Sequence, residues 1–248
     1  MFSRNFLTVA ALLCLKGTHA FMKMPGLSAR QIPANAQGVK TILTPTNVTI
    51  RYKEPGQAGV CETTPGVNSY SGYIDIAPNA HTFFWFFESR RDPIHDPVTL
   101  WLNGGPGSDS LIGLFEELGP CNVTESLETM VNPYSWNEIS NMLFISQPVG
   151  TGFSYGTEGE GSFANITGVY QNTSYAPATG RWPVVDASIL DTTDAAAVAA
   201  YHVLQGFFSG VDQLDVHVDS KEFNLWTESY GGHYGSVNPI HTIKRADC

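Results

Sequence analysis

The chain has 248 residues, with 13 Lys and Arg against 23 Asp and Glu, and therefore a formal net charge of −10. Hydrophobic residues make up 42% of it and charged residues only 15%. This composition excludes a disordered tail, a collagen-like fibre and a basic nucleic-acid-binding protein, and the acidic balance argues against anionic lipid as a partner. The length allows one large or two small domains. We expect a soluble extracellular protein with a well-filled core.

Residues 1–20 have the pattern of a secretory signal peptide. Arg4 provides the positive charge, residues 7–15 form an apolar run, and small residues before and at Ala20 provide a cleavage site. A short membrane anchor or a core helix is the alternative, but so short a run, which ends at Lys16, spans less than half of a bilayer. We therefore expect cleavage after Ala20 and no membrane partner afterwards.

Sequons and cysteines agree with a secretory route. Cys14 lies in the signal peptide, which leaves Cys61, Cys121 and Cys248, an odd number for an oxidising compartment. A bridge between Cys61 and Cys121 is one option, and the odd cysteine suggests that a partner cysteine is missing from this chain. The candidate glycosylation sites are the four Asn-x-Ser/Thr sequons at Asn47, Asn122, Asn165 and Asn172.

Residues 21–40 are rich in Pro, Gly and Ala, and we expect a flexible arm or propeptide there. We expect a single folded unit over residues 41–235. Its first strand-like runs are bounded by Gly, Pro and Asn, and their short spacing predicts antiparallel hairpins or a meander. They are residues 48–52, 69–76 and 82–88, followed by 98–102.

The second part of this unit predicts a parallel α/β arrangement. Residues 142–146 form an apolar run typical of a strand buried on both faces, and residues 223–226 form a similar run. Between them, Asp191 or Thr192 can cap a helix that ends at about Phe208. Strand, helix and strand in this order build a parallel sheet. We interpret residues 156–180, rich in Gly and Ser, as an exposed loop.

The sharpest chemical signal is Asn-Leu-Trp-Thr-Glu-Ser-Tyr-Gly-Gly-His-Tyr at 224–234. A strand that runs directly into x-Ser-x-Gly-Gly is typical of a nucleophile elbow, in which a tight turn exposes the serine hydroxyl, here that of Ser229. Thr227 stands where the G-x-S-x-G pattern has its first glycine. An ordinary loop serine is the alternative.

A glycine-rich turn, Trp-Leu-Asn-Gly-Gly-Pro-Gly at 101–107, follows the run 98–102. Such a turn lets backbone N–H groups face a bound group. An α/β-hydrolase needs one oxyanion-hole N–H after the nucleophile and one from an early loop, which here would be Tyr230 and Gly105. A plain turn or a phosphate loop are the alternatives, but no Gly-Lys-Ser/Thr follows and Gly-x-Gly-x-x-Gly does not match.

Five sequence blocks together resemble the serine carboxypeptidase family, peptidase family S10, and are most similar to its fungal secreted S1-type enzymes. The resemblance covers roughly residues 60–235 and implies the N-terminal portion of an α/β-hydrolase fold, with a mixed, mostly parallel sheet and flanking helices. The blocks are residues 101–107, 115–120, 132–137, 147–155 and 228–234.

The resemblance also implies roles for single residues. Ser229 matches the acylated nucleophile, and the N–H groups of Gly105 and Tyr230 match the oxyanion hole. The residues that match the site for the C-terminal carboxylate of the substrate are Trp101, Asn103, Gly104, Glu117 and Glu228. A carboxylate beside two glutamates is repelled unless one is protonated, so a glutamate pKa should rise on binding and hydrolysis should be favoured at acidic pH. That suits a secreted or vacuole-like setting.

Two departures from the family pattern affect these expectations. Ser108 stands where the family usually has a cysteine that bridges to its downstream half. The family's Asp and His follow the serine in that order, whereas His241 and Asp247 have the reverse order and follow Ser229 too closely. The match of the blocks stops at Gly235, and we interpret residues 236–248 as a divergent tail of a truncated chain, from a frameshift, a retained intron or a mispredicted splice.

The resulting interpretation is a serine carboxypeptidase that releases C-terminal amino acids from peptides through an acyl-enzyme. Loss of the base would impair this chain by roughly 10⁴- to 10⁶-fold. An acyltransferase on the same scaffold, or a non-catalytic secreted glycoprotein fragment, are the alternatives. His233 is expected to be structural, and His202 and His217 to be helix and loop residues. No His/Cys/Asp/Glu cluster has metal-ligand spacing, so we expect neither metal nor cofactor.

Overall fold

The computed structural model describes residues 36–164, 169–171, 179–184, 192–214, 216 and 218–236. The signal peptide, most of the predicted arm and the tail after residue 236 lie outside the described residues. So do Asn165, Asn172, His217 and Cys248.

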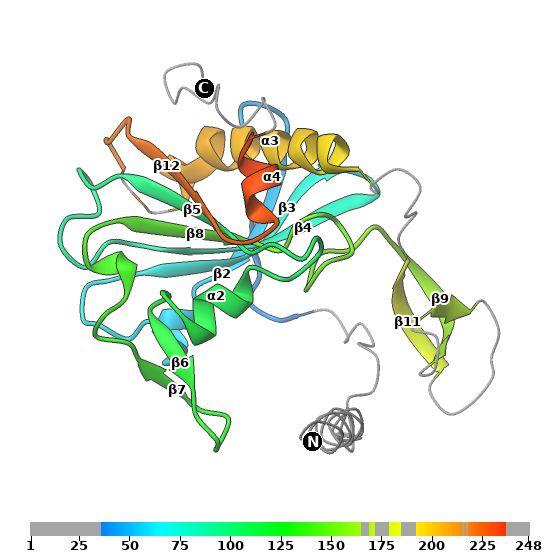
Figure 1. Cartoon of the computed structure of the whole chain (residues 1–248), viewed down its shortest axis with the longest axis horizontal. Helices are drawn as coiled ribbons and strands as arrows, with labels where there is room; N and C mark the ends of the chain where they lie inside the picture. The colour runs from blue at the N-terminus through cyan, green and yellow to red at the C-terminus, as the bar shows by residue number, and fades with distance from the viewer. Residues whose placement is uncertain are drawn as a thin grey trace, which may run out of the picture.

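A seven-stranded mixed sheet forms the centre of the molecule (Figure 1). Strands β8, β5 and β12 are parallel neighbours. Strands β1 to β4 pair antiparallel in chain order, and β4 also pairs antiparallel with β8. The predicted mixed sheet is thus confirmed, but among the described strands it is not mostly parallel: two of its six pairings are parallel, both at the β12 edge, because the first four strands pair antiparallel. In spatial order the strands are β1 Lys40–Leu43, β2 Thr49–Lys53, β3 Ser69–Ala77, β4 Ala80–Phe87, β8 Asn141–Ile145, β5 Val98–Leu102 and β12 Phe223–Thr227. The six strands predicted from the sequence are all present, and β1 is additional.

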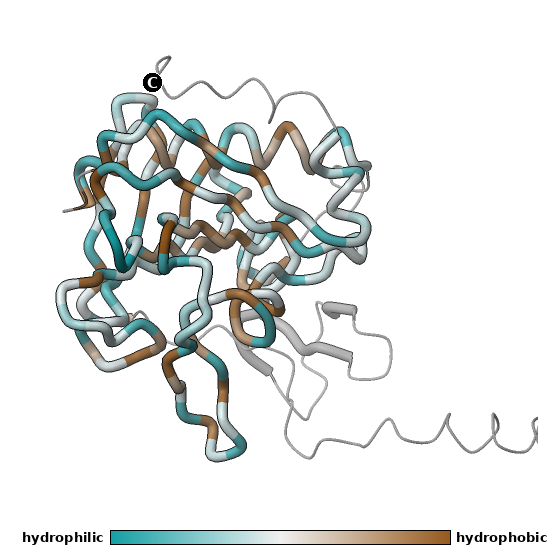
Figure 2. The backbone as a smooth tube through the Cα atoms, turned by 60° about the vertical axis from the view of Figure 1, so that its left-hand side comes forward, coloured by the Kyte–Doolittle hydropathy of each residue, from teal (hydrophilic) through white to brown (hydrophobic). Residues whose placement is uncertain are grey.

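Each face of the sheet has its own core, and β4 contributes to both. Because side chains alternate along a strand, Phe84 and Phe86 pack in one hydrophobic cluster, whereas Trp85 and Phe87 pack in the other. Figure 2 shows the hydrophobic stretches gathered in the strands at the centre of the molecule. The mostly hydrophobic sequence of β4 is therefore that of a strand covered on both sides.

Helix α3, Thr193–Gly210, covers the first face and confirms the predicted helix (Figure 1). The Thr192 side chain accepts a hydrogen bond from the Ala195 N–H at 3.1 Å and so caps the helix. The helix packs Ala200, Leu204 and Phe207 into the core, where Phe207 lies 5.9 Å from Phe84 between ring centroids.

The opposite face is covered by α2, Leu111–Glu116, together with the small β6–β7 hairpin (Figure 1). A disulfide joins Cys61 to Cys121 at the start of β6, so the pairing that the sequence left open is present. The remaining short elements are β6 Cys121–Val123, β7 Thr129–Val131 and the 3₁₀ helices η2 Pro55–Ala58, η3 Trp136–Glu138 and η5 Val211–Gln213.

The prediction that residues 156–180 form only an exposed loop is wrong. A second antiparallel sheet lies beside the main one (Figure 1) and consists of β9 Thr157–Ala164, β10 Val169–Gln171 and β11 Thr179–Val184. Its strands pair through backbone groups, which do not require alternating apolar residues. A Gly- and Ser-rich sequence therefore gives no periodic signal here.

Candidate active site

The chain reverses direction sharply at Ser229, between the end of β12 at Thr227 and the start of α4, Gly231–Ser236. Ser229 has φ 54°, in the left-handed region that costs a non-glycine residue about 1–3 kcal/mol. The Gly231 N–H donates to the Glu228 carbonyl at 2.7 Å and closes the turn. The strand, tight turn and helix predicted from the sequence are confirmed, and Ser229 is exposed at the turn.

Small residues are needed around this turn because other backbone segments approach it closely. A Cβ on Gly231 would lie 2.6 Å from the Thr227 Cβ, so glycine is required directly after Tyr230. A Cβ on Gly104 would lie 2.5 Å from the Tyr230 backbone nitrogen and 2.9 Å from the Ser229 Cβ. The glycine-rich loop and the serine turn are thus in direct contact.

The sheet explains why these two segments meet. β5 and β12 are parallel neighbours with Leu102 paired to Thr227, so the residues that follow each strand leave the sheet at the same edge. Gly105 has φ 105° and Gly107 φ 81°, values that favour glycine. Among the hydrogen bonds that join described residues, none uses the N–H of Gly105 or of Tyr230.

A polar network beside the turn joins several of the predicted carboxylate-binding residues. Asn103 is buried, with 2% of its surface exposed, and its side-chain Nδ2 donates a hydrogen bond to Oε1 of Glu228 at 2.5 Å. Its Oδ1 accepts from the Trp101 indole N–H at 2.9 Å and from the Gly113 N–H at 3.0 Å. Asn103 is therefore fixed in one orientation, with its carbonyl occupied by two donors.

Glu117 interacts with the same cluster through the charge of Glu228 and the side chain of Asn103. Partial burial raises the pKa of its carboxyl above the usual 4.5, and the negative charges of Glu228 and Glu116 raise it further, while Asn103 opposes the shift. Trp101, Asn103, Gly104, Glu117 and Glu228 are therefore brought to one place.

No role was predicted from the sequence for two other residues at this edge. Tyr234, on α4, accepts a hydrogen bond from the Gly107 N–H at 3.2 Å. Asp109 accepts from the Ser146 hydroxyl at 2.8 Å and from the Leu111 N–H at 3.3 Å, which joins α2 to the segment after β8. The Tyr234–Gly107 and Asp109–Ser146 hydrogen bonds link residues far apart in the chain, so no local sequence pattern predicts them.

No histidine in the described part of the chain hydrogen-bonds to the Ser229 hydroxyl. The ring of His233 packs on Tyr230, 4.6 Å between centroids, as expected for a structural residue, and His202 lies on α3. In the same residues no group of three or more His, Cys, Asp or Glu could hold a metal ion, and no helix is long and apolar enough to cross a bilayer.

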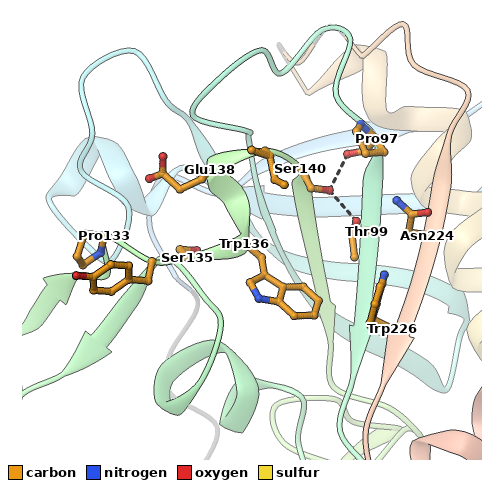
Figure 3. Close-up of a pocket in the computed structure, with 11 residues that line it drawn as sticks. Pro97, Thr99, Pro133, Ser135, Trp136, Glu138, Ser140, Asn224 and Trp226 are labelled. Atoms are coloured by element: carbon orange, nitrogen blue, oxygen red, sulfur yellow. Dashed lines mark hydrogen bonds between the residues drawn. The ribbon is translucent and has the colours of Figure 1, made fainter.

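A pocket of about 580 Å³ lies next to β12 (Figure 3), and Ser229 is not among its lining residues. Residues from the end of β7 to β8 line one side and the exposed face of β12, with Asn224 and Trp226, lines the other. The ring of Trp136 lies 5.3 Å from Trp226 and 5.7 Å from Trp101, so the pocket wall is continuous with the Asn103 network.

The sheet, the serine turn on its parallel part and the glycine-rich loop against that turn define an α/β-hydrolase. The serine carboxypeptidase family matches residues 55–241. The motifs were expected to stop matching at Gly235, and the family match extends six residues further. The chain belongs to this family.

Similar proteins are fungal carboxypeptidases. The chain is 40% identical over 179 residues to carboxypeptidase S1 of Penicillium janthinellum, which covers 72% of this chain and 34% of that protein. It is 36% identical over 196 residues to a vacuolar serine-type carboxypeptidase of Saccharomyces cerevisiae, covering 79% and 31%. A solved prohormone-processing carboxypeptidase from the same yeast superposes with a TM-score of 0.51 at 24% identity, over 71% of this chain and 34% of that one. The chain thus spans about a third of the length of these relatives.

Proposed function

We propose that this chain forms the nucleophile side of a serine carboxypeptidase that removes C-terminal amino acids from peptides through an acyl-enzyme at acidic pH. One observation carries the proposal: the strained turn at Ser229 lies against Gly104, inside the region that matches the family. A serine held at a positive φ is costly, and such strain is concentrated at functional sites.

In the proposed reaction the Ser229 hydroxyl attacks the carbonyl of the C-terminal peptide bond. The N–H groups of Gly105 and Tyr230 stabilise the oxyanion of the tetrahedral intermediate, the terminal amino acid leaves, and water releases the acyl group. The absence of any other acceptor for these two N–H groups among described residues supports this role, because an oxyanion hole needs donors that are free in the resting protein.

The network around Asn103 is proposed to bind the substrate's terminal carboxylate. A bound carboxylate next to Glu117 and Glu228 is tolerated only when one of them carries a proton. The raised pKa of Glu117 supports this, because a neutral Glu117 can donate a hydrogen bond to the carboxylate. Binding should weaken as the pH rises and Glu117 ionises, so hydrolysis is favoured in acid.

The proposed reaction also needs a general base and an acid that orients it. None of the histidines in the described ranges serves as the base, so we propose that both groups come from residues outside these ranges. Without them, we expect Ser229 to react slowly.

We propose that the protein follows the secretory route to an extracellular or vacuole-like compartment. The signal-peptide pattern and the Cys61–Cys121 bridge support this, since disulfides persist in oxidising compartments. Of the two described sequons, Asn47 is exposed and favoured as a glycan acceptor. Asn122 is half-buried and its amide nitrogen donates to the Phe115 carbonyl at 2.9 Å, so a glycan there would require that bond to break.

The test compares an N-blocked dipeptide that has a free carboxylate with the same dipeptide amidated at its C-terminus. A full-length protein that includes the residues supplying the base and the orienting acid should release the terminal amino acid only from the free acid, faster at pH 5 than at pH 8, as followed by mass spectrometry. Ser229→Ala should abolish this release, whereas Ser236→Ala, at the exposed last residue of α4, should retain it. Equal cleavage of the amide, or activity that survives Ser229→Ala, would contradict the proposal.

A further inference from the structure

Tyr234 connects the helix behind the serine turn to the glycine-rich loop. Its side chain is 2% exposed and its ring belongs to the core beneath α3. Its hydroxyl oxygen accepts the N–H of Gly107 at 3.2 Å, across 127 positions of sequence. The ring also packs edge-on against Tyr230, 5.3 Å between centroids.

Gly107 is a point where the loop can be fixed. It has φ 81° and lies two residues after Gly105, on the exposed side of the loop. At the loop's start the Asn103 N–H donates to the Ser110 hydroxyl at 3.3 Å. Between these two bonds lies the Gly105 peptide, whose own N–H has no acceptor among described residues. The direction of that N–H therefore depends on how the chain is held on both sides of it.

We propose that Tyr234 is a positioning residue whose hydroxyl holds the glycine-rich loop so that the Gly105 and Tyr230 N–H groups point to one oxygen. The roles of these N–H groups rest on the proposed function. Tyr234 suits the task because it comes from α4, the helix that begins directly after Tyr230. One rigid element then sets both donors. Burial raises the pKa of the Tyr234 phenol, so the hydroxyl stays neutral throughout the acidic range.

Amide hydrogen exchange tests the contact in the full chain. Gly107 should be protected in the wild type, and Tyr234→Phe, which keeps the ring and removes the acceptor, should speed its exchange roughly five- to tenfold, the effect of one hydrogen bond. Thr193→Val is the matched control, because Thr193 shares a 2.8 Å hydrogen bond with the hydroxyl of Tyr230. It should leave Gly107 exchange unchanged. An unprotected Gly107 in the wild type overturns the proposal even if Tyr234→Phe fails to fold. Equal exchange in wild type and Tyr234→Phe, or equal acceleration by both variants, also overturns it.

A fluorophosphonate tests the effect on the oxyanion site. Ser229 Oγ displaces fluoride from phosphorus and releases its proton to solvent, while the phosphoryl oxygen occupies the oxyanion position. Tyr234→Phe should lower the maximal rate of labelling about tenfold and leave the concentration for half-maximal rate unchanged. The loss is smaller than the roughly 10²- to 10³-fold effect of removing an oxyanion donor, because the N–H is misdirected and not removed. A change in the half-maximal concentration alone would overturn the proposal. If a full-length wild type that includes the base and the orienting acid does not label at Ser229, the proposed function fails, and the exchange of Gly107 still decides whether Tyr234 holds the loop.

Discussion

Replacing Gly104 by alanine tests the close contact on which the candidate site depends. The added Cβ would lie 2.5 Å from the Tyr230 nitrogen, 2.9 Å from the Glu228 carbonyl oxygen and 2.9 Å from the Ser229 Cβ. None of these atoms is the end of a flexible side chain, so the loop and the turn must move apart. Overpacking of this kind costs about 1–3 kcal/mol, and three simultaneous contacts place Gly104→Ala near about 3 kcal/mol.

Gly232→Ala is the matched control for this prediction. Gly232 lies in α4, three residues after Ser229, and no heavy atom outside its chain neighbours and its own helix backbone lies within 4 Å of the position that its Cβ would occupy. Alanine favours a helix over glycine, so Gly232→Ala should raise the free energy of unfolding by about 0.5 kcal/mol. A glycine-to-alanine change inside the contact and one just outside it are therefore expected to change the free energy of unfolding with opposite signs.

Urea unfolding followed by circular dichroism measures both effects. Gly104→Ala should lower the midpoint with an unchanged slope, which would show that the native state was destabilised and not that the unfolded state became more compact. Labelling of Ser229 by the fluorophosphonate should fall in the same variant, because the turn is displaced. A free energy of unfolding within about 0.5 kcal/mol of wild type, the range of a neutral surface substitution, would refute the close approach of the two segments.

Three further predictions concern polar side chains, of which Asn103 and Glu62 are buried and Glu117 is exposed. Asn103→Ala should cost about 2 kcal/mol in urea unfolding, because it leaves two N–H donors without their acceptor. Burial raises the pKa of Glu62, but hydrogen bonds from Thr64 and Asn137 and the charge of Arg90 lower it overall. Ionised Glu62 therefore stabilises the fold at a pH above the usual pKa of 4.5, and this stabilisation is lost as the pH falls through the lowered pKa. Glu62→Gln should cost about 3 kcal/mol at pH 7, and the difference from wild type should shrink in acid unfolding. The pKa of Glu117 is raised, so its effect on stability has the opposite pH dependence. The folded protein should lose stability as the pH rises above 4.5, and Glu117→Gln should remove this dependence in thermal melts.

Local sequence patterns were sufficient for six of the seven strands of the main sheet and for the serine turn. β5 and β8 are buried on every residue, so a short apolar run identified each of them. At Ser229 a strand pattern stops directly before Ser-x-Gly-Gly, and only a tight turn accommodates that change. By contrast, β9 to β11 depend on backbone pairing between segments without a side-chain period, and composition alone predicted a loop.

The polar contacts could not be predicted because they depend on the order of strands in space. Asn103 and Glu228 are 125 positions apart and meet because β5 and β12 are adjacent and parallel. The sequence predicts both strands but not their adjacency, since β8 lies between them in the chain and on the other side of β5 in the sheet. Once β12 is placed beside β5, the loops that follow the two strands must share one edge, and Gly104 is the residue that lets them touch. The family resemblance suggested roles for these residues before the geometry brought them together. Tyr234 lies in the 224–234 motif without a role of its own, and its contact with Gly107 could be found only from the structure.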